Sequence, residues 1–124
     1  MKLVVVGSME FYQKYLELEK QLIKKGHKVI LPLLYELYNK ANVTKRDTME
    51  DFNKELLKSD AILVANYDKN NIDNYIGVNG LMEIGMAFNR KKKIFILNKI
   101  PQNCKEELKA IEAIELNENL EKIK

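Results

Sequence analysis

The chain has 124 residues, of which 46% are hydrophobic and 31% are charged, a composition typical of one soluble globular domain spanning residues 1–124. The net charge of +3 does not indicate a nucleic-acid partner, because basic residues mostly alternate with acidic ones, as on solvated helix faces. The apolar runs are too short for a membrane span, the start is too short for a signal peptide, and the single cysteine excludes an internal disulfide. We therefore expect a cytoplasmic protein with no membrane partner.

The first part of the chain alternates apolar runs with amphipathic segments. The run "KLVVVG" (2–7) predicts a strand buried on both faces, and an apolar stripe from Phe11 to Leu22 predicts a helix that ends near Gly26. A second strand follows at 27–32. Residues 33–45 are polar and tyrosine-rich, and the pattern leaves them open between a long connection and a short helix within it.

The second part repeats the alternation. A stripe of Met49, Phe52 and Leu56 predicts a helix, and "DAILVAN" (60–66) predicts a third strand. A polar loop over 67–80 has a length that is usually functional or mobile in so small a domain. We then expect a helix over 81–91, a strand over 92–98, a helix near 105–109, an edge strand over 110–116 and a short final helix.

This order of elements predicts an α/β fold, a three-layer domain with a mainly parallel sheet of about five strands. Spacing alone leaves the order of the strands open. Ligands of such sheets bind beyond the carboxyl ends of the strands, where the strand order reverses. That rule gathers the Gly7–Ser8 turn, Asn66–Asp68 and the loop before Glu83 at one rim.

The Gly7–Ser8 turn follows the first strand directly. A glycine lets the backbone turn sharply into a helix whose free N–H groups favour an anion. The Ser8 hydroxyl suits either a helix cap or a ligand contact, and both readings stay open. Neither a dinucleotide-binding GxGxxG nor a phosphate-binding GxxxxGK[ST] occurs in the sequence.

Glu83 stands alone among glycines and apolar residues. If Asn79 or Gly80 caps the helix, Glu83 falls in about its first turn, where the helix dipole keeps a carboxylate ionised, as a nucleophile requires. Gly77 and Gly80 leave room for a ligand to approach. The alternative is an ordinary glutamate at a helix start.

The other candidate side chains carry weaker signals. Asp68 follows the third strand at the rim, whereas Asp60 begins that strand and is better explained as a strand-entry residue. His27 is the only histidine, and Cys104 has no neighbouring base to activate it. No metal-ligand spacing occurs, so we expect neither a metal nor another cofactor.

Several segments in order resemble the nucleoside 2-deoxyribosyltransferase-like superfamily: "GSM", "GHKVILP", "SDAILVANYDK" and above all "YIGVNGLMEIGMAF" with "KKIFILNKIP". The resemblance implies a Rossmann-like or flavodoxin-like sheet and cleavage or exchange of the N-glycosidic bond of nucleosides or their 5'-monophosphates. It also implies that Glu83, followed by Gly85 and Ala87 as in the family's E-x-G-x-A helix, is the nucleophile at the sugar C1'.

Two positions depart from the family pattern. Gly77 stands where the transferases have an aspartate and the related nucleotide hydrolases a serine. Phe52, with Asp51 beside it, stands where transferases have another aspartate. Asp60 and Glu83 match. The resemblance therefore implies a divergent branch, with the substrate or the activity itself in question.

From residues and resemblance together we predict a hydrolase or transferase of a nucleoside or nucleoside 5'-monophosphate. Glu83 attacks the anomeric carbon, Asp68 assists departure of the base, and Tyr67 or Tyr75 stacks on the base. The predicted substrate-binding residues are the glycines and the polar and aromatic side chains of the rim: Gly7, Ser8, Asn66, Tyr67, Tyr75, Gly77, Asn79 and Gly80.

Two alternatives remain open. One is a nucleotide-binding or regulatory module without turnover, favoured by Gly77 in place of an acidic or hydroxyl side chain. The other is a subunit that uses the tyrosine-rich segment, with Tyr35 and Tyr38, for protein contacts. Analogy with relatives implies a homo-oligomer.

Overall fold

The computed structural model describes residues 1–32 and 42–124, and within them a five-stranded sheet in which every pairing is parallel. The strand order is β2-β1-β3-β4-β5. The strands are β1 (Lys2–Val6), β2 (Lys28–Ile30), β3 (Ala61–Val64), β4 (Lys93–Ile96) and β5 (Ile114–Glu115). The predicted α/β class and the parallel sheet are confirmed.

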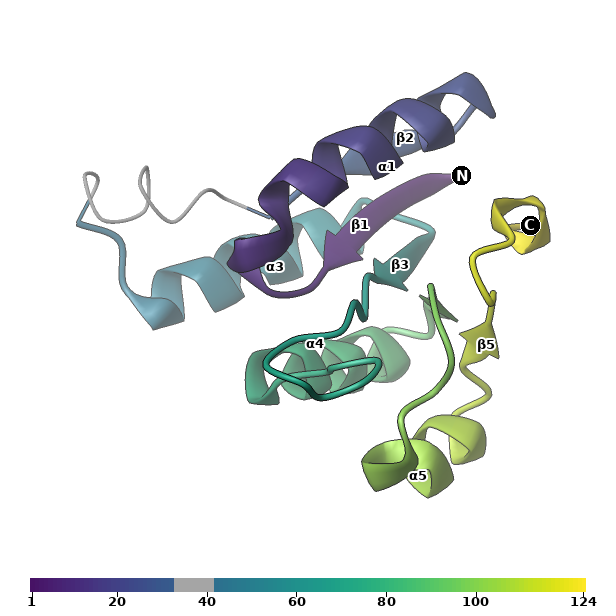
Figure 1. Ribbon diagram of the computed structural model, residues 1–124. Helices are drawn as coiled ribbons and strands as arrows, with labels where there is room; N and C mark the ends of the chain where they lie inside the picture. Colours follow the sequence, from purple (N-terminus) through teal and green to yellow (C-terminus); the bar gives the residue numbers. More distant parts are fainter. Residues whose placement is uncertain (33–41) are drawn as a thin grey trace.

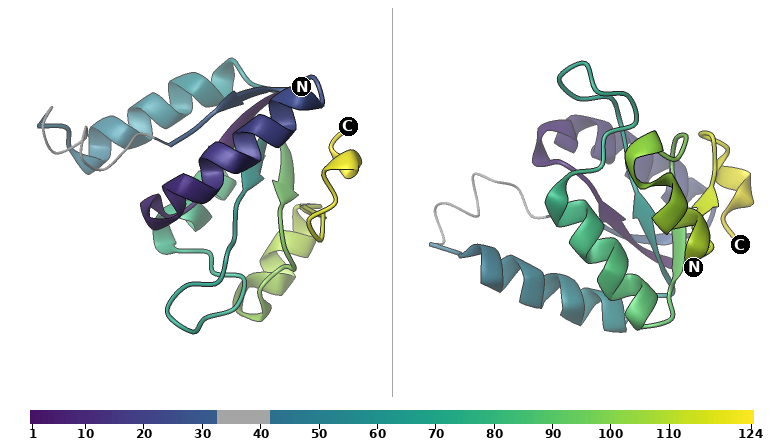
Figure 2. Two further views of the ribbon diagram at one scale, coloured as in Figure 1. Left: turned by 45° about the horizontal axis from the view of Figure 1, so that its top comes forward. Right: turned by 90° about the horizontal axis from the view of Figure 1, so that it is seen from below.

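Helices cover both faces of the sheet, which makes three layers (Figure 1). One face carries α1 (Tyr12–Lys24), preceded by the 3-10 turn η1 (Met9–Phe11), and the C-terminal turn η3 (Leu120–Lys122). The other face carries α3 (Lys45–Leu57), α4 (Val78–Asn89) and α5 (Lys105–Ala110), the last preceded by η2 (Gln102–Cys104). Figure 2 shows the polar loop between β3 and α4 projecting from the rest of the chain in both views.

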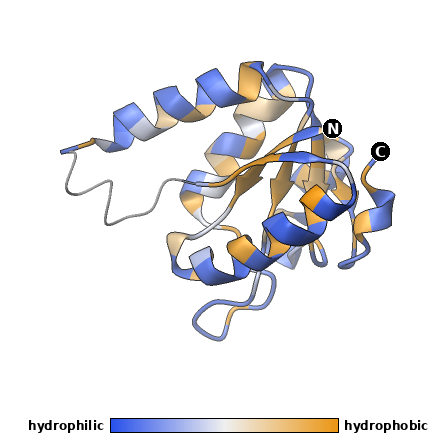
Figure 3. Cartoon of the chain, turned by 90° about the horizontal axis from the view of Figure 1, so that it is seen from above, coloured by the Kyte–Doolittle hydropathy of each residue, from blue (hydrophilic) through white to orange (hydrophobic). Residues whose placement is uncertain are grey.

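The strand residues alternate between the two apolar cores, as their pleat requires. Leu3 and Val5 of β1 pack on the side of α1, whereas Val4 and Val6 pack on the side of α3 and α4. Figure 3 shows the resulting apolar sheet between helices whose outer surfaces are mostly hydrophilic. Burial on both faces is why the sequence shows continuous apolar runs rather than alternating ones.

Several predicted boundaries are corrected. Helix α4 begins at Val78, inside the expected loop, with Gly77 as its N-cap and no side-chain cap. For helix α3 the apolar stripe predicted no start; the helix begins at Lys45, because Thr44 and Asp47 form a reciprocal capping box ahead of the stripe. The edge strand expected over 110–116 shrinks to β5, and the expected final helix is the single 3-10 turn η3.

The predicted end of the first helix is as expected, and one predicted element lies largely outside the residues that the structure describes. Gly26 ends α1 with a φ of +93°, a conformation that favours glycine. The suggested helix within 33–45, with Tyr35 and Tyr38, lies largely outside the described residues. Among the residues that are described, no helix is long and apolar enough to cross a membrane.

The strand order creates one position where the chain changes direction. From β1 the chain moves outward to β2, then crosses back to β3 on the other side of β1. The loops after β1 and β3 therefore leave towards different neighbours, which opens a crevice at the carboxyl ends of these two strands.

Candidate active site

A pocket with a volume of about 650 Å³ lies at the carboxyl ends of β1 and β3. The turn after β1, the loop after β3 and the first turns of α4 form most of its wall. Its lining comprises residues 6–10, Lys45, Val64, Ala65, Lys69, residues 75–80 and Glu83. The structure thus brings together seven of the residues predicted from the rim of the sheet: Gly7, Ser8, Tyr75, Gly77, Asn79, Gly80 and Glu83.

Glu83 projects from α4 into this pocket and is only partly exposed. Burial raises the pKa of its carboxyl group from 4.5 to about 7, while the positive charge of Lys45 acts in the opposite direction. The expectation of a carboxylate held ionised by the helix start is therefore corrected. Glu83 lies six residues after the N-cap Gly77, beyond the first turn where the dipole acts, so desolvation dominates.

The Glu83 carboxylate is also unpaired in the part of the chain that the structure describes. Among those residues no hydrogen bond and no ion pair involves its oxygens. Helix α4 is held instead by apolar neighbours of Glu83: Ile84 and Ala87 are buried against β3 and β4. A partly buried carboxyl group that titrates near neutrality and faces a pocket is a candidate for chemistry.

Tyr15 of α1 packs against the Gly7–Ser8 turn and holds it in place. A Cβ atom on residue 7 would overlap the Tyr15 hydroxyl and come within 3.1 Å of the Ala65 carbonyl, so glycine is required there. The Tyr15 hydroxyl donates to the Ser8 carbonyl at 2.5 Å. Burial raises the pKa of Tyr15, with smaller contributions from Tyr67 and Glu83, so this donor stays protonated.

The Ser8 hydroxyl serves as a cap and also faces the pocket. It accepts a hydrogen bond from the Glu10 N–H at 3.4 Å and one from the Lys69 ammonium at 3.1 Å. Lys69 Nζ also lies 3.7 Å from Glu10 Oε1 and 5.0 Å from the centre of the Tyr75 ring. The lysine thus ties the loop after β3 to the turn after β1, next to an aromatic side chain.

Tyr75 occupies the space that a side chain at position 77 would need. A Cβ atom added to Gly77 would lie 2.9 Å from the Tyr75 hydroxyl and 3.3 Å from two of its ring carbons. The absence of a side chain at Gly77 therefore lets the Tyr75 phenol lie against the start of α4. Asn79 is exposed and lines the pocket from the first turn of the same helix.

Three predicted rim residues lie outside the pocket lining. Asp68 is exposed, and its carboxylate accepts a hydrogen bond from the Asn74 N–H at 2.8 Å, so it stabilises the loop rather than facing Glu83. Asn66 is buried and joins β3 to the segment after β4: its amide donates to the Lys99 carbonyl and accepts from the Asn98 N–H, both at 2.8 Å.

Tyr67 points away from the pocket and belongs to the core on the α1 side. Its ring lies 5.4 Å from that of Phe11 and 6.3 Å from that of Tyr15, and the Lys14 ammonium lies above it at 4.7 Å. Of the two tyrosines expected to stack on a base, Tyr75 lines the pocket and Tyr67 does not.

The remaining sequence candidates are structural or distant. Asp60 lies at the opposite, amino end of the sheet, where its carboxylate accepts from the Lys2 N–H at 2.8 Å, as expected for a strand-entry residue. Phe52 is buried between α3 and the sheet, and Asp51 lines an adjoining hollow. His27 Nδ1 lies 3.1 Å from the N-terminal amino group.

Three charged residues of the pocket were not predicted from the sequence: Glu10, Lys45 and Lys69. The T-x-x-D pattern at Thr44 and Asp47 is a capping box that would have placed Lys45 at a helix start. Nothing in the sequence distinguishes Lys69 from any solvated loop lysine. In the described ranges, no group of three His, Cys, Asp or Glu side chains is arranged to hold a metal ion.

Comparison with known structures supports the fold. The solved structure of a Clostridium botulinum CMP N-glycosidase, BcmB, is similar to this chain with a TM-score of 0.63 over 94% of this chain and 89% of that one, at 17% sequence identity. No protein-family model and no curated protein matches the sequence. At this identity the likeness shows a shared α/β fold.

Proposed function

We propose that the protein cleaves the N-glycosidic bond of a nucleoside or nucleoside 5'-monophosphate, with Glu83 as the nucleophile. The observation that carries the proposal is the unpaired Glu83 carboxyl group, with a pKa raised to about 7, facing a pocket of about 650 Å³. The similarity of the fold to that of a CMP N-glycosidase supports the same chemistry.

In the proposed reaction, ionised Glu83 attacks the anomeric carbon and forms a glycosyl ester. The bond from the sugar to the base breaks, its electron pair goes to the base nitrogen, and that nitrogen takes up a proton from solvent. Water then hydrolyses the ester, or a second base accepts the sugar. Because only the ionised carboxylate attacks, the rate of the first step should rise with pH through about 7.

The wall of the pocket suggests how the substrate is held. The Lys69 ammonium and the Ser8 hydroxyl, 3.1 Å apart, suit an oxygen or a phosphate on the sugar 5' carbon. The Tyr75 ring suits stacking against a base. Its hydroxyl lies 2.9 Å from where a Cβ atom of residue 77 would be, so Tyr75 supplies a polar group close to where the family resemblance expects an aspartate or a serine.

The experiment is a chromatographic assay for free base released from ribo- and deoxyribonucleosides and their 5'-monophosphates, with and without acceptor bases. We expect Glu83→Gln to lower the rate at least about 10³-fold, because it removes the nucleophile. Asp60→Asn is the matched control, since that carboxylate lies at the other end of the sheet. Base release that Glu83→Gln leaves unchanged would exclude this mechanism.

A second candidate is a nucleotide-binding module without turnover. It is favoured by one observation: apart from Glu83, the carboxylate on the described pocket wall is Glu10, which lies 3.7 Å from Lys69. A binding module predicts that a nucleoside monophosphate binds in calorimetry with equal affinity to wild type and Glu83→Gln and releases no base.

We also propose a homo-oligomer. Helix α4 exposes several large apolar side chains: Val78 is 76% exposed, and Met82 and Phe88 are each 54% exposed. Large apolar side chains exposed on one helix are a feature that burial in a subunit interface would explain. Light scattering on the purified protein tests the proposal, and a monomeric mass at micromolar concentration would contradict it.

A further inference from the structure

A second hollow, with a volume of about 490 Å³, shares part of its wall with the pocket and extends between β1 and α3. The residues common to both are Val6, Gly7, Met9, Lys45, Asn79 and Glu83. Lys45 and Glu83 are the two charged members of this set. An ammonium and a carboxyl group from different helices therefore stand at the junction of the two hollows.

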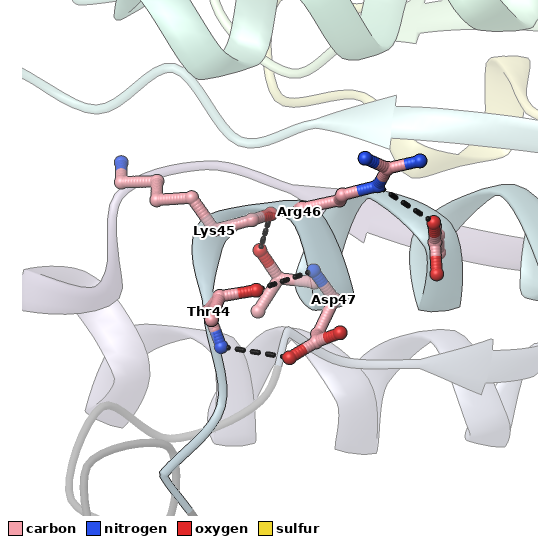
Figure 4. Close-up of polar contacts among 6 residues, drawn as sticks. Thr44, Lys45, Arg46 and Asp47 are labelled. Carbon is pink, nitrogen blue, oxygen red and sulfur yellow. Dashed lines mark hydrogen bonds and ion pairs between the residues drawn. The ribbon is translucent and has the colours of Figure 1, made fainter.

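The position of Lys45 is fixed by the start of α3. Thr44 Oγ1 accepts from the Asp47 N–H at 3.1 Å, and the Asp47 carboxylate accepts from the Thr44 N–H at 2.9 Å. This capping box makes Lys45 the first residue of the helix. Figure 4 shows the Lys45 side chain extending to the side opposite that of Arg46.

The local structure gives no reason for a lysine at this position. The N-terminal end of a helix carries a partial positive charge, so a cation there is unfavourable. The neighbouring cation, Arg46, is compensated by an ion pair with Glu50, four residues further along the helix, with 3.1 Å between Arg46 Nε and Glu50 Oε1. Among the described residues no carboxylate lies within ion-pair distance of Lys45.

Several of the other charged and titratable groups around Glu83 have partners of their own. Lys69 contacts Glu10 and Ser8, and Tyr15 donates to the Ser8 carbonyl. On the α3 side, Glu55 lies 4.0 Å from Lys2. The charged and titratable groups around Glu83 are Glu10, Lys45, Lys69 and Tyr75 on the pocket wall, Tyr15 beneath the Gly7–Ser8 turn, and Asp51, Lys54, Glu55 and Lys58 along the adjoining hollow.

We propose that Lys45 is a positioning residue for the charge of Glu83: its ammonium group favours the ionised carboxylate that the nucleophile needs. The lysine acts across the junction of the two hollows, without touching the reacting atoms. The direction agrees with the electrostatics, because Lys45 lowers the pKa of Glu83 against the larger effect of burial. The consequence for catalysis rests on the proposed function, whereas the consequence for titration does not.

The first experiment follows the Glu83 carboxyl carbon by NMR during a pH titration of protein labelled with ¹³C in its glutamate carboxyl groups. Glu83→Gln identifies the signal. We expect Lys45→Met to move the midpoint upward, Lys45→Arg to leave it near that of the wild type, and Arg46→Met to leave it unchanged. Arg46 is the matched control, because its loss removes one positive charge from the same turn. An unchanged midpoint in Lys45→Met, or an equal shift in Arg46→Met, would overturn the proposal.

The second experiment measures base release by the same variants across pH. We expect Lys45→Met to lose about two- to fivefold relative to the wild type at about pH 6, as for two opposite charges near the surface whose interaction is worth up to about 1 kcal/mol. The loss should vanish at about pH 9, where Glu83 is ionised in both proteins. A uniform loss at all pH values would contradict a role through the charge of Glu83. If no nucleotide is cleaved by the wild type, the proposed function fails and the titration still decides the role of Lys45.

Discussion

The two ends of the sheet place a carboxylate in opposite situations. At the amino end, Asp60 is exposed, its carboxylate accepts from the Lys2 N–H at 2.8 Å, and its backbone N–H donates to the Lys2 carbonyl at 2.9 Å. At the carboxyl end, Glu83 is partly buried and its carboxylate has no hydrogen bond among the described residues. Asp60 holds two strands together, whereas the ionised form of Glu83 opposes folding.

The comparison separates two kinds of carboxylate, one that has a hydrogen-bond partner and one that has none among the described residues. A carboxylate kept for stability has hydrogen-bond partners, so removing it should destabilise the protein without touching the chemistry. A carboxylate kept for chemistry is held in an unfavourable setting, so removing it should stabilise the protein and abolish activity. Measuring stability and rate on the same variants tests the distinction directly.

The largest expected effect is on the pH dependence of stability in Glu83→Gln. Since folding raises the pKa of Glu83 from 4.5 to about 7, the folded protein binds more protons than the unfolded chain between these values. Stability of the wild type should therefore fall as pH rises from about 4.5 to 7. Glutamine does not ionise, so the variant should exceed the wild type by on the order of 3 kcal/mol above about pH 8 and by little below about pH 5.

Urea unfolding at several pH values, followed by circular dichroism, measures this difference. Asp68→Asn is a suitable control, because that carboxylate is exposed on the loop and caps the Asn74 N–H. If Glu83→Gln were no more stable than the wild type at alkaline pH, the carboxyl group would not be desolvated in the folded protein. Burial would then not be the reason why the pKa of Glu83 is raised to about 7.

A smaller and opposite effect is expected for Asp60→Ala. The substitution removes the acceptor of the Lys2 N–H at the exposed amino end of the β1–β3 pair. This loss should lower the free energy of unfolding by about 1 kcal/mol. The rate of base release should stay within about twofold of the wild type, because Asp60 lies at the end of β3 away from the pocket. A large loss of rate at unchanged stability would break the comparison between the two ends.

How much of this the sequence predicts depends on whether a residue's signal is local. The strands were predicted because burial on both faces leaves continuous apolar runs, as in Leu3–Val6 and Ile94–Leu97. Glu83 was predicted because a carboxylate among glycines and apolar residues is unusual. The start of α4 was misplaced because its cap, Gly77, makes no side-chain hydrogen bond that a pattern could reveal.

The wall of the site was less predictable, because tertiary contacts decide it. An asparagine after a strand has the same pattern whether it binds a substrate or, like Asn66, two backbone groups of the segment after β4. Tyr67 and Tyr75 both lie in the polar loop, yet Tyr67 packs against the core and Tyr75 lines the pocket. Lys69 reaches Ser8 across 61 residues of sequence, a contact that no local pattern indicates.

The smallest expected effect concerns the contact between Gly77 and Tyr75, in the pocket wall at the carboxyl end of the sheet. In Gly77→Ala the new methyl group would lie 2.9 Å from the Tyr75 hydroxyl, so the ring must shift by a few tenths of an ångström. The backbone at residue 77 is extended and tolerates alanine, so the fold should be unaffected. If Tyr75 holds the base, KM should rise about three- to tenfold with kcat nearly constant.

Gly85→Ala adds the same methyl group to the same helix, where nothing lies within 4 Å of it. That control should leave KM unchanged and stabilise α4 by up to about 1 kcal/mol, because alanine is the better helix former. Equal KM values in the two variants would mean that Tyr75 does not hold the substrate. A rise in KM confined to Gly77→Ala would instead indicate that Tyr75 holds the substrate, and that the absence of a side chain at residue 77 leaves room for its ring.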